Sequence, residues 1–158
     1  MYPPRLLTTG FLLALFLPTA ARTAAAQDPA ETTDPVLVAL DGRIKSFLEG
    51  VSLGQTQNAY QELLADSQLA KQDQALKDLV TQTIELHAKY GEYRGFEQIA
   101  ARRVGQDLVL LKYLYKCEHF PVVWYLTFYR TPPKSPPENG DWRVIIVRFD
   151  TELELLAF

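Results

Sequence analysis

The chain has 158 residues, and its 16 basic and 19 acidic side chains give a net charge of −3 at pH 7. It holds no block of basic residues, so it is a poor candidate for binding nucleic acid or an anionic membrane, because basic contacts to phosphate dominate both affinities. Cys117 is the only cysteine, which excludes an intramolecular disulfide. A domain of this length is large enough to depend on its apolar core alone.

Residues 1–26 have the three-part pattern of a secretory signal peptide. A basic start precedes a mostly apolar run over residues 6–17, and Ala24-Ala25-Ala26 supplies the small side chains needed for cleavage. The apolar run is shorter than the roughly 20 residues that span a bilayer, which disfavours a retained membrane anchor. The sequence therefore predicts a secreted or periplasmic protein, cleaved after Ala26 and without a membrane span after cleavage.

After a flexible lead over 27–33, a single domain is predicted over 34–158, and its first half has helical periodicity. Asp34 and Pro35 suit the cap and the first position of a helix. The stretches predicted to be helical are 35–50, 56–64 and 67–91. We expect Gly50 to stop the first helix. The apolar stripe of the third helix is formed by Leu76, Leu79, Val80, Ile84, His87 and Tyr90.

The second half of the domain alternates with a period of two, which indicates strands. Strands are predicted over 96–104, 108–117, 122–130 and 142–149. Helices followed by consecutive strands define an α+β fold, with three N-terminal helices packed on a curved antiparallel sheet of about four strands. Residues 151–158 fit a helical turn or an edge segment, and the sequence leaves the two open.

The alternation also assigns the faces of the sheet. The core face of the third strand is predicted to hold Val122, Trp124, Leu126 and Phe128. The core face of the second strand is predicted to hold Val109, Leu111, Tyr113, Tyr115 and Cys117. Lys112 and Lys116 mark the opposite face as the wetter one, yet that face is unusually apolar for a sheet with water on one side. This pattern suggests a homodimer formed through the outer faces of two sheets.

Several stretches resemble the NTF2-like superfamily, the cystatin-like α+β cone. They are Phe47-Leu48-Glu49-Gly50 through Ala59-Tyr60-Gln61-Glu62-Leu63-Leu64, Tyr90-Gly91-Glu92-Tyr93 and Trp142-Arg143-Val144-Ile145. Within that group the chain looks most like small exported members of unassigned function. The resemblance implies a cavity between helices and sheet and dimers through the sheet. It implies no reaction, because one fold hosts many functions.

An enzyme of this fold needs a base and an oxyanion donor inside an apolar cavity. Glu97 is the candidate base, because its strand neighbours are apolar or glycine, and Tyr113 or Tyr115 is the candidate donor. The competing interpretation pairs Glu97 with a basic side chain on the wet face, where strand carboxylates are usually found. We favour that pairing over a catalytic role.

Other side chains are candidates for contact with a ligand. His87 and Tyr90 lie on the helical stripe and either line a cavity or belong to the core. Tyr113 and Trp124 lie on the helix-facing side of the sheet. Arg143 is predicted to share the concave face with Ile145, Val147 and Phe149, where a guanidinium needs an anionic partner.

The Cys117-Glu118-His119 triplet places a thiol and an imidazole on one side of an extended strand. Such a pair suits a nucleophile or two metal ligands, but zinc needs three or four ligands, so we expect a plain strand end and turn. No metal or cofactor is predicted. The leading function is an exported, non-catalytic binding or structural module with a small ligand between helices and sheet. The alternatives are an NTF2-like isomerase, cyclase or hydrolase, and an interaction subunit that docks through its outer sheet face.

Overall fold

The structure is a computed structural model that describes residues 34–131 and 140–153. The predicted signal peptide and flexible lead, and residues 154–158 of the predicted C-terminal segment, therefore lie outside the described residues. The helices are α1 (Pro35–Ser52), α2 (Thr56–Leu64), the short 3-10 helix η1 (Gln68–Lys71) and α3 (Asp73–Tyr90). The strands are β1 (Tyr93–Val104), β2 (Leu108–Cys117), β3 (Val122–Arg130) and β4 (Trp142–Asp150).

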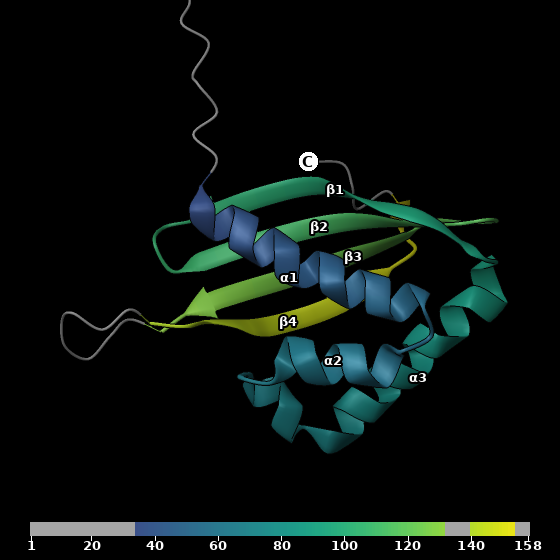
Figure 1. Cartoon of the computed structure of the whole chain (residues 1–158), viewed down its shortest axis with the longest axis horizontal. Helices are drawn as coiled ribbons and strands as arrows, with labels where there is room; N and C mark the ends of the chain where they lie inside the picture. The colour runs from purple at the N-terminus through teal and green to yellow at the C-terminus, as the bar shows by residue number, and fades with distance from the viewer. Residues whose placement is uncertain (1–33, 132–139, 154–158) are drawn as a thin grey trace, which may run out of the picture. The chain divides into compact units, whose positions relative to one another are not determined.

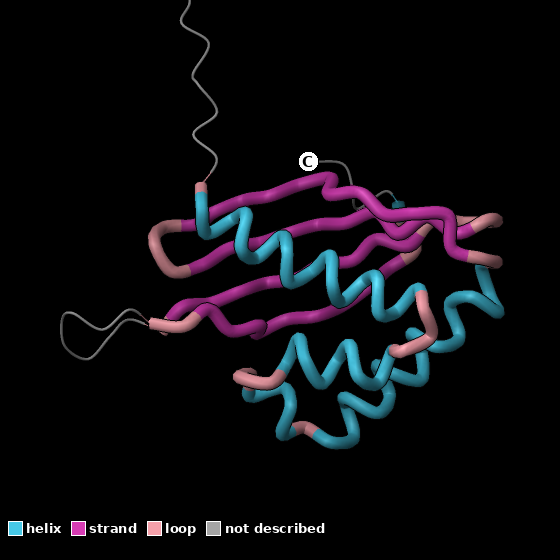
Figure 2. The backbone as a smooth tube through the Cα atoms, viewed as in Figure 1, coloured by secondary structure: helices cyan, strands magenta, loops and turns pink. Residues whose placement is uncertain are grey.

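The predicted α+β class is confirmed: the three α-helices precede a four-stranded antiparallel sheet in the order β1-β2-β3-β4. Every strand pairs with its neighbour in the sequence, and β1 and β4 are the two edges. Helix α1 lies across one face of the sheet, and α2 lies beside the β4 edge (Figure 1; Figure 2). No helix in the described part of the chain is long and apolar enough to cross a membrane.

The start of α1 agrees with the prediction from the sequence, but its end does not. The Asp34 carboxylate accepts a hydrogen bond from the Val36 backbone N–H at 2.9 Å, so it caps the helix as expected. The helix runs past Gly50 to Ser52. Gly50 instead lies against α2, where an added Cβ would stand 2.9 Å from the Ala59 Cβ. This glycine serves a close approach of two helices rather than a helix stop.

The third predicted helix is divided into two. The Ser67 hydroxyl accepts a hydrogen bond from the Leu69 backbone N–H at 3.1 Å and begins η1, and α3 starts only at Asp73. The predicted apolar stripe of α3 is also wrong at one position, because Ile84 is 60% exposed. Its neighbour Thr83 is buried there, bonded to the phenol of Tyr60 on α2.

The predicted core faces of β2 and β3 are confirmed. All nine side chains assigned to them are buried, and the largest of the fully buried ones are Trp124, Tyr113, Tyr115 and Phe128. They pack against α1 and α2: the Phe47 ring meets those of Tyr60 and Trp124 edge-on, at 4.9 and 5.3 Å between centroids. The aromatic residues of the sheet therefore form the centre of the core beneath the helices.

The alternation of β4 is interrupted by a bulge. Val147 and Phe149 face Leu126 and Trp124 across the strands, but Val144 rather than Ile145 faces Phe128. One extra residue in the strand reverses every side chain before it. Arg143 thus pairs with Tyr129 on the outer face, and its predicted place on the concave face is wrong.

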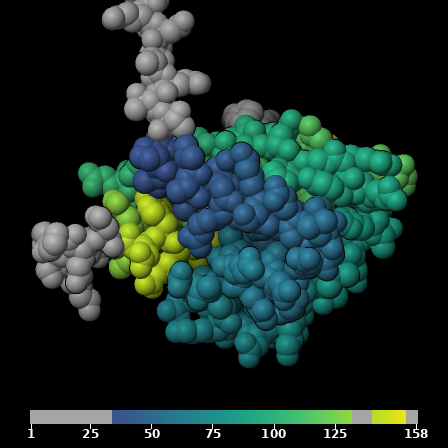
Figure 3. Space-filling model, in the orientation of Figure 1, coloured from purple at the N-terminus to yellow at the C-terminus, as the bar shows by residue number. Residues whose placement is uncertain are grey.

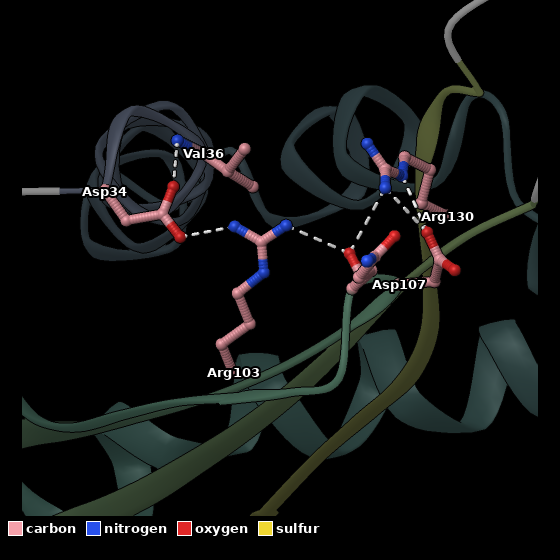
Figure 4. A network of polar contacts seen from close by, with 6 residues as sticks. Asp34, Val36, Arg103, Asp107 and Arg130 are labelled. Atoms are coloured by element: carbon pink, nitrogen blue, oxygen red, sulfur yellow. Dashed lines mark hydrogen bonds and ion pairs between the residues drawn. The ribbon is translucent and has the colours of Figure 1, made fainter.

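A polar network joins the start of α1 to the far end of the sheet (Figure 4). Arg103 of β1 binds the carboxylate of Asp34 and donates to the Gln106 backbone carbonyl at 3.0 Å. Arg130 of β3 donates from Nε to Asp107 in the β1–β2 turn at 2.8 Å. The hydrogen bond from Arg103 holds the pKa of Asp34 below its ordinary value. These charges are compensated in pairs and fix the end of the sheet.

Candidate functional site

The space between α1 and the sheet is occupied by aromatic side chains. Trp124, Tyr113 and Tyr115 are fully buried there, and the Phe149 ring lies 4.8 Å from that of Trp124. In the space-filling view, α1 lies directly against α2 and β4 on the helical face (Figure 3). Tyr113 and Trp124, which the sequence analysis placed among the ligand contacts, are thus members of the packed core.

Tyr113 takes part in a polar contact that the sequence analysis missed. Its hydroxyl donates to the carboxylate of Asp41 on α1, and Lys45 pairs with the same carboxylate at 2.7 Å. Burial, and then the hydrogen bond to Asp41 and the charge of that carboxylate, raises the pKa of Tyr113 far above its ordinary value. The phenol therefore keeps its proton and ties the sheet to α1.

His87 and Tyr115 form a second pair between α3 and the sheet. The His87 Nε2 and the Tyr115 hydroxyl lie 2.9 Å apart, and the two rings are stacked with centroids 6.2 Å apart. Burial is the main cause that raises the pKa of Tyr115. A neutral phenol bonded to an imidazole anchors the last turns of α3 to β2.

The remaining candidates at this end of the molecule have structural partners. The Tyr90 ring lies 6.0 Å from that of Phe120, and the Tyr90 carbonyl accepts from the His119 backbone N–H at 2.9 Å. The Cys117 thiol is buried at the end of β2, and burial raises its pKa, which is the opposite of thiol activation. His119 is exposed in the turn that follows.

Glu97 lies on the outer face of the sheet, opposite Leu114 in the strand register. Its carboxylate binds the Lys116 ammonium at 2.9 Å, and both side chains are about half exposed to solvent. The surface ion pair that the sequence analysis favoured for Glu97 is therefore present.

A groove runs along the open edge of β4, between that strand and the η1–α3 segment, and we call it the β4 groove. Its apolar part has a volume of about 300 Å³. Leu64, Leu69, Leu76 and Leu79 line this part from the helices, and residues 145–147 line it from the strand. Ile145 and Ile146 are 42% and 46% exposed, so the groove is open to solvent.

The β4 groove continues into a second part of about 410 Å³, which we call the polar part because more of the residues that line it carry polar or charged side chains. The two parts share Leu69, Gln72 and Ile145. The polar part adds the side chains of Tyr129 and Arg143, together with Ser67 and Gln68 from the start of η1. Arg143 therefore reaches a cavity after all, but at the edge of the sheet rather than inside the cone expected from the sequence.

Two side chains hold the helices to β4 beside this groove. The Ser67 hydroxyl donates to the Val144 carbonyl at 2.5 Å, and Arg43 of α1 donates to the Trp142 carbonyl at 2.8 Å. Both bonds use carbonyls of the first half of the edge strand, ahead of the bulge. Ile145 is the extra residue of the bulge, and Ile145 and Ile146 follow directly after these two contacts along the strand.

The outer face of the sheet carries exposed apolar side chains in two neighbouring rows of the strand register. They are Val104, Leu110, Tyr129 and Ile146. In the other half of the same face, the Tyr125 ring is buried beside two basic side chains. The Arg148 guanidinium lies 4.4 Å from the ring centroid, and the Lys112 ammonium lies 5.4 Å from it. The outer face is therefore mixed, as its sequence pattern suggested.

No group of three or more potential metal ligands occurs within residues 34–131 and 140–153. No family model matches the chain, and neither a curated protein nor a solved structure matches it. The architecture defines an α+β domain with its helices N-terminal to the sheet, and the resemblance to the NTF2-like superfamily stays a prediction.

The sequence held one signal for the β4 groove. Val144 to Val147 is a run of four apolar residues, which breaks the alternation of a half-buried strand. Such a run marks either a bulge or a strand with apolar surroundings on both sides. The helical half of the groove had no such signal, because Leu76 and Leu79 belong to an ordinary amphipathic stripe.

Proposed function

We propose that the protein is a non-catalytic binding module that holds a small apolar ligand in the β4 groove. The observation that carries this proposal is that two exposed isoleucines of β4, Ile145 and Ile146, line the groove together with leucines from α2, η1 and α3. Covering such side chains with an apolar ligand is favourable by roughly 25 cal/mol for each Å² removed from water.

The size of the groove limits the ligand. A volume of about 300 Å³ in the apolar part stands at the lower end of small-molecule sites, which span roughly 300–1,000 Å³. A single aliphatic chain or one small ring system fits this space. The proposal includes export of the protein, since the signal-peptide pattern of residues 1–26 accompanies the domain.

The surroundings of the candidate catalytic groups support binding over catalysis. Glu97, the candidate base, lies in a surface ion pair with Lys116, and the Cys117 thiol has a raised pKa. Tyr113 donates to Asp41 inside the packed core. Each of these groups has a structural partner or an environment that disfavours its reactive form.

A fluorescence titration with the neutral apolar dye N-phenyl-1-naphthylamine tests the proposal. We expect the dye to bind the parent protein and to lose at least about tenfold in affinity in Leu79→Glu, because the new carboxylate would be buried beside the ligand. Ile84→Glu is the matched control, since Ile84 lies on the same helix, is exposed and does not line the groove.

Circular dichroism of both variants checks that the substitutions leave the fold intact. The proposal fails if the parent does not bind the dye, or if Leu79→Glu and Ile84→Glu bind it equally well.

A further inference from the structure

The two parts of the β4 groove differ in chemistry along one continuous path. Leucine and isoleucine residues dominate the lining of the apolar part, while the residues that line the second part include Arg143, Tyr129 and Gln68. Gln72 and Ile145 border both parts. A ligand that lies along the whole groove therefore meets apolar surface at one end and hydrogen-bond donors at the other.

Arg143 gives the polar part a positive charge. Among the residues that the structure describes, its lining includes Arg143 and no aspartate or glutamate. Within the described ranges Arg143 forms no ion pair, whereas Arg103 and Arg130 each bind an aspartate. The chain as a whole has a net charge of −3, opposite in sign to the charge of Arg143.

Arg143 is positioned by the backbone rather than by a side-chain partner. The β4 bulge places it opposite Tyr129 in the register, on the same side of the sheet edge. Arg143 and Tyr129, two residues whose side chains can donate hydrogen bonds, thus line the same end of the groove. A guanidinium binds a carboxylate with two parallel hydrogen bonds, which no neutral head group can reproduce.

We infer that the ligand of the β4 groove is a single-chain anionic amphiphile of the fatty-acid type. Its carboxylate binds Arg143, and its aliphatic chain lies along Leu76 and Leu79 against Ile145. This inference rests on the proposed function, since it names the ligand class of the same groove.

Displacement of N-phenyl-1-naphthylamine by two ligands of equal chain length tests the inference on the full chain. Dodecanoate carries the head group that Arg143 would bind, and dodecan-1-ol does not. We expect dodecanoate to bind about tenfold more tightly than the alcohol, as is typical of a charge-assisted bond. The difference should shrink as the salt concentration rises.

Three variants identify the residue responsible. Arg143→Gln should lower dodecanoate affinity about tenfold and leave dodecan-1-ol affinity unchanged, while Arg143→Lys should retain part of the preference because only the planar fork is lost. Arg102→Gln is the matched control, since Arg102 is an exposed arginine on β1, at the opposite edge of the sheet. It should behave as the parent does.

The outcomes separate the inference from the function on which it rests. If the dye binds in the groove but acid and alcohol bind equally, or if Arg143→Gln weakens both alike, the anionic class is wrong and the apolar binding module stands. The same holds if neither ligand displaces the bound dye. If the dye itself does not bind, the proposed function fails and the inference fails with it.

Discussion

Gly50 of α1 and Ala59 of α2 approach so closely that a methyl group on Gly50 would stand 2.9 Å from the Ala59 Cβ. Real Cβ atoms do not approach this closely, so one of the two helices would have to move. The contact fixes the angle at which the chain turns from α1 into α2, and α2 in turn packs against η1 and β4. A small residue is therefore required inside α1 at a place where helix propensity alone favours alanine.

Gly50→Ala should destabilise the protein by about 1–3 kcal/mol, the usual effect of overpacking. Gly42→Ala is the matched control in the same helix, because nothing lies within 4 Å of a Cβ at that position. There alanine should stabilise the protein by about 0.5–1 kcal/mol. Urea denaturation measures both changes, and a second substitution, Ala59→Gly, should restore much of the stability lost in Gly50→Ala. A gain in stability for Gly50→Ala would contradict the close contact.

The buried hydroxyls of Tyr60 and Thr83 give a second test. Thr83 Oγ1 donates to the Leu79 carbonyl at 2.7 Å and therefore accepts from the Tyr60 hydroxyl at 2.9 Å. Thr83→Val should cost about 1–3 kcal/mol, because it leaves a buried phenol without a partner. Thr83→Ser should be milder. The double variant with Tyr60→Phe should recover most of the loss, and simple additivity of the two substitutions would count against the bond.

The Asp34–Arg103 pair predicts a dependence of stability on pH. The hydrogen bond from Arg103 lowers the pKa of Asp34 below its ordinary value of 3.8. The ionised carboxylate thus stabilises the fold at pH values above 3.8, and this contribution is lost as pH falls through the lowered pKa. Asp34→Asn keeps a good N-cap and removes only the charge.

The melting temperature of Asp34→Asn should therefore lie below that of the parent at pH 7, and the difference should narrow below pH 3.8. Asp66→Asn, which alters an exposed carboxylate elsewhere, serves as the control. A gap between Asp34→Asn and the parent that stays constant down to pH 2 would contradict the assignment.

The signal-peptide prediction concerns residues outside the described part of the chain and has its own test. Intact-mass measurement of the exported protein should give a chain that begins at Gln27. Ala26→Phe should accumulate as the uncleaved precursor, because signal peptidase needs a small residue at that position. Recovery of the exported parent with residues 1–26 still attached would contradict the prediction.

A substitution on the outer face of the sheet tests the homodimer predicted from the sequence. Light scattering at micromolar concentration should give the mass of two chains, and Leu110→Lys should give that of one, because Leu110 lies among the exposed apolar residues of this face. Ile84→Lys is a suitable control on the helical side. A monomeric parent protein would end the dimer proposal.

The sequence predicted the core faces of β2 and β3 because these strands pair over Leu108–Tyr115 and Val122–Tyr129 without a bulge, so counting by two stays in phase. It misplaced Arg143, because a one-residue bulge at Ile145 cannot be located by counting from the end of the strand. It ended α1 at Gly50, because a glycine at a helix crossing has the same sequence signature as a glycine at a helix stop.

The β4 groove could not be predicted from periodicity. Ser67 and Arg43 hold the helices to the first half of β4, and the groove is lined by the bulge residues that follow them in the strand. This arrangement depends on contacts between segments far apart in the sequence. Only the apolar run over residues 144–147 pointed to it.

The purely sequential order of the sheet has a consequence for how the molecule assembles. The β1–β2 hairpin is closed by the three residues 105–107, whereas β3 and β4 are joined by the eleven residues 131–141. Closing the longer loop costs about 1 kcal/mol more in chain entropy. We therefore expect β4 to join the sheet last, after α1 and the first three strands have formed a folding nucleus. The wall of the groove is then the least protected part of the sheet against hydrogen exchange, and a bound ligand slows exchange there first.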